Sequence, residues 1–134
     1  MTKPVKTSSP TRSRDKVLQT LYELEVGGQD IEEVLENYAS EKSNPFYQDT
    51  LKGVIADLEK IDKILKKNVD RPMERLDAVE KNALRIALYE LMNKKVDMAI
   101  AINESIRLSK KYGSTEGYKL VNAVLDKIVK EHQI

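Results

Sequence analysis

A run of apolar residues at helical spacing constrains this chain more than any other feature. The spacings are 4, 3, 4, 3 and 4 for six residues, which are Tyr47, Leu51, Val54, Leu58, Ile61 and Leu65. On a helix these side chains form one stripe, and the stripe must be buried against neighbouring helices. Lys60, Lys63 and Lys67 fall off the stripe and are predicted to face water. Similar spacing recurs along the chain while alternation with period two does not, so the sequence predicts an all-α fold.

Capping and turn residues divide this pattern into six or seven helices. Asn44 followed by Pro45 is typical of a helix start, and Asp30 is a second candidate cap. Gly113 is well placed to end a helix. The predicted helices span residues 12–26, a segment after residue 30, 45 to about 65, a short turn at 73–76, 78–93, 98–112 and 115–131.

The domain organisation is simple. Residues 1–11 are rich in Pro, Ser and Thr and are predicted to form a flexible basic arm, while residues 12–134 are predicted to form one helical domain. The absence of cysteine excludes disulfides and thiolate metal sites, and we expect no metal and no cofactor. Because no apolar stretch approaches the roughly 18 residues of a membrane span, we expect a soluble, cytoplasmic protein without a membrane partner.

Charge is unevenly distributed along the chain. The net charge is +1, but residues 1–20 carry five bases and one acid, whereas residues 21–50 carry one base and eight acids. Local patches therefore indicate partners better than the net charge does.

The sequence contains few candidate catalytic residues. His132 is the only histidine and lies near the C-terminus, and there is no cysteine nucleophile and no glycine-rich phosphate loop. Glu32, Glu33 and Glu36 have the spacing of a solvated helix face. The sequence therefore predicts a protein that is not an enzyme.

Polar residues interrupt three otherwise apolar runs, and they have two interpretations. One is a structural polar network between helices, with the Arg85 guanidinium accepted by Glu104 or Glu90. The other is a lining of polar groups along a ligand groove. We favour the network, whose predicted members are Arg85, Glu90, Asn103, Glu104 and Asn122.

Basic residues recur beside aromatic residues, a combination that suits single-stranded nucleic acid. Arg12, Arg14 and Lys16 lie within ten residues before Tyr22, Lys110 and Lys111 directly precede Tyr112, and Lys119 directly follows Tyr118. Cations bind phosphates and rings stack on unpaired bases. The alternative is that these tyrosines belong to the core or its rim.

Three linked motifs resemble the NusB family of bacterial transcription antitermination factors. They are LQTLYELE, VEKNALRIALYEL, and AIAINESIRLSKKYG followed by KLVNAVLDKI, in family order between Arg12 and Ile128. The resemblance implies two small helical subdomains and binding to boxA, a short single-stranded RNA element of nascent ribosomal RNA transcripts. It also implies a heterodimer with the ribosomal protein NusE, which acts with NusA, NusG and RNA polymerase.

The resemblance also implies a set of RNA-contacting residues. Arg12 and Arg14 match part of the family's arginine-rich arm, and alanine at both is expected to weaken boxA RNA binding while leaving thermal stability nearly unchanged. Glu80 and Lys81 head the central helix, where RNA and partner meet. The full predicted set is Arg12, Arg14, Lys16, Tyr22, Glu80, Lys81, Lys110, Lys111, Tyr112, Glu116, Lys119 and Leu120.

The sequence departs from the family pattern at several of these places. Thr11 interrupts the arginine run, Leu120 replaces a common aromatic, and Ala123 replaces a glycine. Fewer cations and one lost ring predict weaker RNA affinity and a greater dependence on the partner protein. A protein–protein adaptor whose partner supplies the RNA contact is the alternative, and a homodimer is possible.

Overall fold

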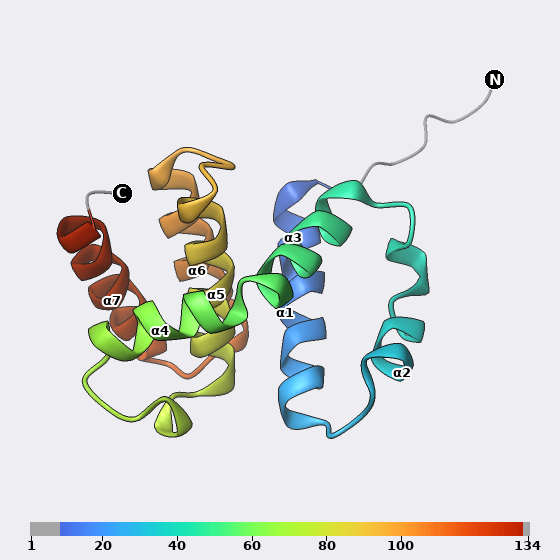
Figure 1. Ribbon diagram of the computed structural model, residues 1–134, viewed down its shortest axis with the longest axis horizontal. Coiled ribbons are helices and arrows are strands. Elements are labelled where there is room, and N and C mark those ends of the chain that lie inside the picture. Colours follow the sequence, from blue (N-terminus) through green and yellow to red (C-terminus); the bar gives the residue numbers. More distant parts are fainter. Residues whose placement is uncertain (1–8, 133–134) are drawn as a thin grey trace.

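The computed structural model describes residues 9–132 and confirms the all-α prediction (Figure 1). Seven α-helices and two short 3-10 helices make up the regular structure of these residues, which contain no strand. In chain order the elements are α1 (Pro10–Val26), α2 (Ile31–Glu36), η1 (Ala39–Glu41), α3 (Pro45–Ala56), α4 (Leu58–Asn68), η2 (Met73–Arg75), α5 (Ala78–Met92), α6 (Met98–Tyr112) and α7 (Gly117–His132).

The first helix begins two residues before its predicted start. The Ser9 hydroxyl caps α1 by accepting a hydrogen bond from the backbone N–H of Arg12 at 3.2 Å. Pro10 takes the first helical position, where a backbone N–H would have no partner in any case. The predicted arm is therefore wrong for residues 10 and 11, which are helical. Residues 1–8 of the predicted arm lie outside the described residues.

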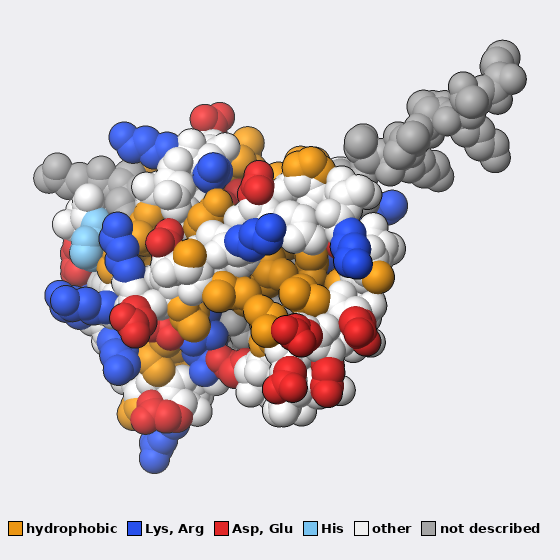
Figure 2. Space-filling model, turned by 45° about the vertical axis from the view of Figure 1, so that its right-hand side comes forward, with side chains coloured by type: hydrophobic (Ala, Val, Ile, Leu, Met, Phe, Trp, Pro, Cys, Tyr) orange, Lys and Arg blue, Asp and Glu red, His pale blue; other side chains and the backbone are white. Residues whose placement is uncertain are grey.

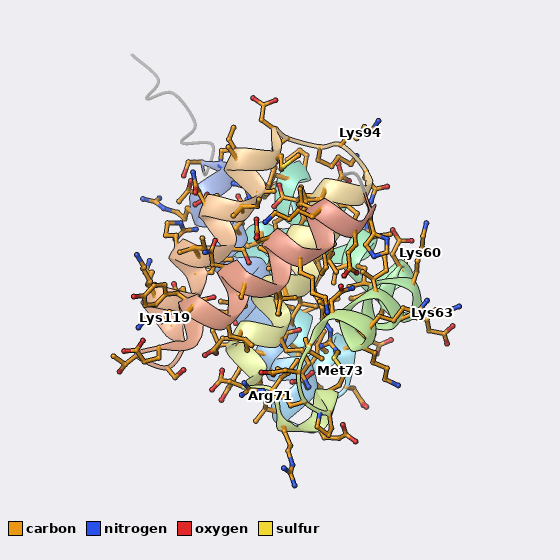
Figure 3. All side chains as sticks on the ribbon, turned by 90° about the vertical axis from the view of Figure 1, so that its left-hand side faces the viewer. Lys60, Lys63, Arg71, Met73, Lys94 and Lys119 are labelled. Atoms are coloured by element: carbon orange, nitrogen blue, oxygen red, sulfur yellow. The ribbon has the colours of Figure 1, made fainter. Side chains whose placement is uncertain are left out.

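The long helix predicted from Pro45 onward is two helices. Asp57 separates α3 from α4 with φ −96° and ψ 11°. The apolar spacing of three and four residues continues across the break, so the sequence pattern does not reveal it. Because of the break, α3 stays against α1 while α4 crosses to α5 and α7 (Figure 1). Lys60 and Lys63 point outward from α4, as predicted (Figure 3).

Two helical subdomains share one core. Helices α1–α3 form one half and α4–α7 form the other (Figure 1). Helix α5 is buried along most of its length and contacts α1, α3, α4, α6 and α7. The buried apolar side chains of both halves form a single cluster, so the halves depend on each other for burial.

Helix α1 places one unusual residue on its buried stripe. Val17, Leu18 and Leu21 are the apolar members of the stripe and are almost fully buried. Arg14 lies three residues before Val17 and four before Leu18, which puts it on the same face of the helix. A charged group thus enters the core at the junction of the two halves.

Two classes of feature are missing from the described residues. No helix between residues 9 and 132 has the length and apolar composition that a bilayer crossing needs. The same residues contain no cluster of three or more histidine or carboxylate side chains suited to a metal ion.

Candidate nucleic-acid interface

The side chains predicted to contact RNA divide into accessible and buried groups. Tyr22 is 40% exposed, which leaves part of its ring accessible for stacking. Arg14 and Glu80 are buried, with 2% and 1% exposure. The other accessible or half-buried members are Arg12, Lys16, Lys81, Lys110, Lys111, Tyr112, Glu116, Lys119 and Leu120.

Part of the accessible group, including Tyr22, Lys110 and Tyr112, lies where α1 meets the end of α6 and the start of α7. Gln19 Nε2 donates a hydrogen bond to the Tyr112 hydroxyl at 3.2 Å, so the middle of α1 lies beside the end of α6. Lys110 Nζ lies 4.7 Å from the centre of the Tyr118 ring, which links α6 to α7. We define the basic-aromatic face as Arg12, Lys16, Tyr22, Lys110, Tyr112 and Lys119.

A hollow of about 310 Å³ lies on this face. Its lining is mainly apolar and aromatic, with two polar side chains, and consists of Leu18, Gln19, Tyr22, Glu23, Val79 and Tyr112. The volume is at the lower end of ligand pockets, which run from about 300 Å³ to 1,000 Å³. Two tyrosines beside an apolar wall suit a flat ring such as an unpaired nucleobase.

The Tyr112 ring is held in place at its hydroxyl and across its face. Its hydroxyl donates to Asp15 Oδ2 at 3.2 Å while accepting from Gln19. Lys111 Nζ lies 5.2 Å from the ring centre, in a cation–π arrangement. Tyr112 is therefore a fixed wall of the hollow, and the exposed Tyr22 is the other aromatic wall.

The start of α7 adds an exposed edge that carries both signs of charge. Lys119 projects from the first turn of α7 (Figure 3) and pairs with Glu116 at 2.6 Å. Both side chains are about two-thirds exposed, so the pair contributes little and either group is free to meet a ligand. Leu120 is half-buried and packs against the core, where it offers no ring to a base.

Arg14 does not lie on the basic-aromatic face, and its predicted RNA contact is wrong. Its Nε and NH2 atoms donate to the two carboxylate oxygens of Glu90, both at 2.7 Å, and NH1 donates to Glu104 at 2.9 Å. The Phe46 ring lies 5.0 Å from its guanidinium carbon. Burial lowers the pKa of Arg14, but the two carboxylates outweigh it and the net pKa is raised. Arg14 is a structural cation.

Glu80 and Lys81 also occupy positions other than those predicted for RNA contact. Lys81 is only 13% exposed and pairs with Glu25 at 3.2 Å. The Ser114 hydroxyl donates to Glu80 Oε1 at 2.7 Å, so the Glu80 carboxyl joins the start of α5 to the α6–α7 loop. Glu80 supports the loop from inside and does not reach the surface.

Burial and the neighbouring Asp77 carboxylate raise the pKa of Glu80 above its ordinary value of 4.5. A raised pKa means that its contribution to stability is complete below that value and is lost as the pH rises through the folded-state pKa. We therefore expect Glu80→Gln to become progressively more stable than wild type above about pH 4.5. Urea unfolding across this range measures the difference, and the exposed Glu116→Gln is the matched control, expected to remain parallel to wild type. Parallel curves for both variants would contradict a shifted Glu80.

The predicted polar network exists, but with different partners. Arg85 donates from Nε and NH2 to Asp62 at 2.9 and 2.8 Å, and from NH1 to Glu25 at 2.8 Å and to Asn82 at 2.9 Å. The predicted pairing of Arg85 with Glu104 or Glu90 is wrong, because Arg14 takes both carboxylates. The core junction thus contains two separate arginine sites.

Asn103 and Asn122 are exposed, and their predicted place in the network is wrong. On α6 the buried positions are Ala101, Ser105 and Leu108, which leaves Asn103 on the opposite side of the helix. On α7 the buried stripe likewise passes beside Asn122 and includes Val121 and Leu125.

Asp15 and Arg107, which the sequence did not single out, complete the site. Asp15 lies on α1 with 7% exposure, and its Oδ1 is 2.8 Å from Arg107 NH1. Its other oxygen accepts from Lys111 Nζ at 2.7 Å. Burial raises the pKa of Asp15, but the hydrogen bonds from Lys111 and Arg107 outweigh it and hold the pKa below its ordinary range. The spacing of Glu104, Arg107 and Lys111 on one helix was the available sequence signal.

The half formed by α1–α3 carries an acid-rich surface that is unsuited to a polyanion. Glu32, Glu33 and Glu36 of α2 are all exposed. Figure 2 shows acidic side chains gathered beside apolar ones on this half of the molecule. A nucleic acid would be repelled there, which leaves the basic-aromatic face as the better candidate.

Comparison with known proteins gives matches over nearly the whole chain. A transcription antitermination protein NusB of Dechloromonas aromatica is 39% identical over 128 residues, covering 90% of this chain and 78% of the relative. The NusB of an Exiguobacterium strain is 37% identical over 122 residues, covering 89% and 95%.

Solved structures agree with this likeness. T. maritima NusB matches with a TM-score of 0.81 at 28% identity and covers 94% of each chain. A crystal structure of antitermination factors NusB and NusE in complex with dsRNA matches with a TM-score of 0.79 at 27% identity, covering 90% of this chain and 96% of that one. The sequence profile of the NusB family matches residues 11–130. With the profile, the relatives and the fold in agreement, this chain belongs to the NusB family.

Proposed function

We propose that this protein is a transcription antitermination factor that binds single-stranded boxA RNA of nascent ribosomal RNA transcripts as a heterodimer with NusE. The observation that carries the proposal is the basic-aromatic face. Its Tyr22–Tyr112 hollow offers stacking surfaces, and Arg12, Lys16 and Lys110 offer charges for phosphates. Unpaired bases can reach such a hollow, whereas bases stacked inside a duplex cannot.

The family relationship supports the partners. The relatives are named transcription antitermination proteins, and one structural neighbour was solved with NusE and RNA. We infer that this chain pairs with NusE in the same way and works with NusA, NusG and RNA polymerase on transcripts in the cytoplasm. It acts by binding, as an adaptor without catalysis.

A protein-only adaptor is the second candidate, and the internal pairing of cations favours it. Arg14, Arg107 and Lys111 are all held by carboxylates of this chain, which reduces the charge available to RNA. In that case NusE would supply most of the RNA contact.

Fluorescence anisotropy separates the two candidates. A short boxA RNA and a scrambled control are titrated with this protein alone and with equimolar NusE, at two salt concentrations. Selective binding that strengthens with NusE supports the proposal, with a log–log salt slope of about −2 to −3 if three or four phosphates are neutralised. NusE binding without any RNA selectivity would replace it with the protein-only adaptor.

Tyr22→Leu is expected to weaken boxA binding by about 5- to 150-fold, the equivalent of losing one stacked base. Stability should be nearly unchanged because the Tyr22 ring is already 40% exposed. Anisotropy measures the affinity, and circular dichroism measures folding. Ile55→Ala is the matched control, since Ile55 is 37% exposed on α3, away from the basic-aromatic face. Equal RNA affinity for Tyr22→Leu and wild type would remove Tyr22 from the site.

A further inference from the structure

We propose that Asp15 limits the RNA affinity of this protein by acting as an internal anion that competes with RNA phosphate for Arg107 and Lys111. The inference rests on the proposed RNA-binding function and concerns the same face. It assigns a role to a carboxylate that stands among the cations of the site.

The geometry is that of an anion site already filled. Three groups of α6 converge on the Asp15 carboxylate. Lys111 Nζ and the Tyr112 hydroxyl donate to Oδ2 at 2.7 and 3.2 Å, and Arg107 NH1 forms an ion pair with Oδ1 at 2.8 Å. Guanidinium, ammonium and hydroxyl groups are the donors that bind phosphate oxygens in nucleic-acid complexes. Here a carboxylate of α1 takes the place that a phosphate oxygen would occupy.

The ion-pair cluster around Asp15 has no net positive charge. Arg107 Nε donates to Glu104 at 2.5 Å, and the same carboxylate accepts from Arg14. Counting Glu90, three carboxylates balance three cations, and the connected members are Arg14, Arg107, Lys111, Asp15, Glu90 and Glu104. A neutral cluster exerts little attraction on a polyanion.

Asp15 connects two regions with complementary chemistry. It contacts Tyr112, which lines the Tyr22–Tyr112 hollow described above. It also contacts Arg107 and Lys111, which belong to a shallow basic surface on α6 that includes Asn103, Ile106 and Lys110. Asp15 already engages two of the three cations on this basic surface, Arg107 and Lys111.

Lys110 provides an internal comparison with Lys111. The ion pairs of residues 9–132 include Lys111 but not Lys110, Arg12 or Lys16. The Lys110 ammonium faces the Tyr118 ring instead. Two adjacent lysines therefore differ in whether their charge is available to RNA.

Asp15 could also assist binding by holding Lys111 and Tyr112 in position, and relative magnitudes decide between the two effects. The Lys111 side chain is 54% exposed, and fixing an exposed lysine with one carboxylate has little energetic effect. A negative charge within ion-pair distance of two cations has a larger effect on how strongly those cations attract a phosphate. Removal of the charge should therefore raise RNA affinity.

The first test is Asp15→Asn, which keeps the side-chain volume and removes the charge. We expect boxA RNA to bind about tenfold more tightly, with a log–log salt slope steeper by about 0.7 for one further phosphate contact. Asp126→Asn is the control, because it makes the same charge change in an exposed pair on α7, 3.0 Å from Lys130. Its RNA binding should match wild type. Unchanged or weaker binding by Asp15→Asn would overturn the inference.

A second test does not depend on the folding of Asp15→Asn. Lys110→Gln and Lys111→Gln remove the same charge from neighbouring positions of wild-type protein. We expect Lys110→Gln to reduce the salt slope by about 0.7 and Lys111→Gln to reduce it by clearly less. Equal reductions would overturn the inference. If neither the wild type nor any variant bound RNA, with or without NusE, the proposed function itself would be refuted.

Discussion

Arg14→Ala is expected to lower the free energy of unfolding by about 3–5 kcal/mol, because it leaves the buried carboxylate of Glu90 without its cation. Arg14 and Glu90 are each 2% exposed in their side chains, so water does not replace the lost partner. Glu104 is less affected, since Arg107 and Thr11 also donate to it. Urea unfolding followed by circular dichroism gives the value directly.

Arg71→Ala is the matched control for this loss. Arg71 donates to Asp70 at 2.8 Å, but the side chains are 46% and 72% exposed. An exposed pair of this kind contributes little to stability, because water competes for both charges. A similar loss for Arg14→Ala and Arg71→Ala would mean that the Arg14 site is not the buried ion pair described here.

Gly117→Ala is expected to cost about 1–3 kcal/mol of unfolding free energy, as overpacking of a filled site does. A Cβ at position 117 would lie 1.6 Å from Glu80 Oε1 and 2.4 Å from Glu80 Cδ. Glu80 is 1% exposed and bound to Ser114, so it can move aside only by giving up that hydrogen bond. Denaturant unfolding again measures the effect.

A double-mutant cycle tests the cause of this loss. In a Glu80→Ala background the atoms that meet the new Cβ are gone, so Gly117→Ala should have little further effect. Additive losses from Gly117→Ala and Glu80→Ala would show that the loss arises elsewhere, for example in the start of α7.

Helix positions were predictable where local chemistry decides them. Asn44 and Pro45 start α3 as predicted, with the Asn44 side chain accepting from the Tyr47 N–H. The α6 boundaries, Met98 and Tyr112, are also those predicted. The break at Asp57 was missed because it leaves the apolar spacing intact, so tertiary packing decides it.

The partners of buried charges were not predictable to the same degree. Arg14 was assigned to RNA because it lies in a basic stretch, although its spacing to Val17, Leu18 and Leu21 places it on the apolar stripe. The choice between Arg14 and Arg85 for Glu90 depends on how α1 and α5 are rotated against each other. The spacing of residues along the sequence does not determine this relative rotation of the two helices.

The accessible part of the candidate site followed from the sequence more closely. Tyr22 and Tyr112 were predicted as aromatic members, and the structure brings them to one hollow. Asp15 was not predicted as a site residue, because one acidic residue in a basic segment is expected from ordinary charge balance. Its importance comes from its contacts with Arg107, Lys111 and Tyr112 on α6, a helix whose packing beside α1 no local pattern specifies.

The contacts of α1 with later helices also determine when a newly synthesised chain can close its core. Arg14 precedes Glu90 by 76 residues and Glu104 by 90, and Asp15 precedes Tyr112 by 97. While the ribosome has produced only α1–α4, this guanidinium has neither carboxylate and must remain hydrated, so the first helices cannot close their core. The core around α1 therefore closes only after α5 and α6 have been synthesised, which makes folding of the N-terminal half depend on the C-terminal half.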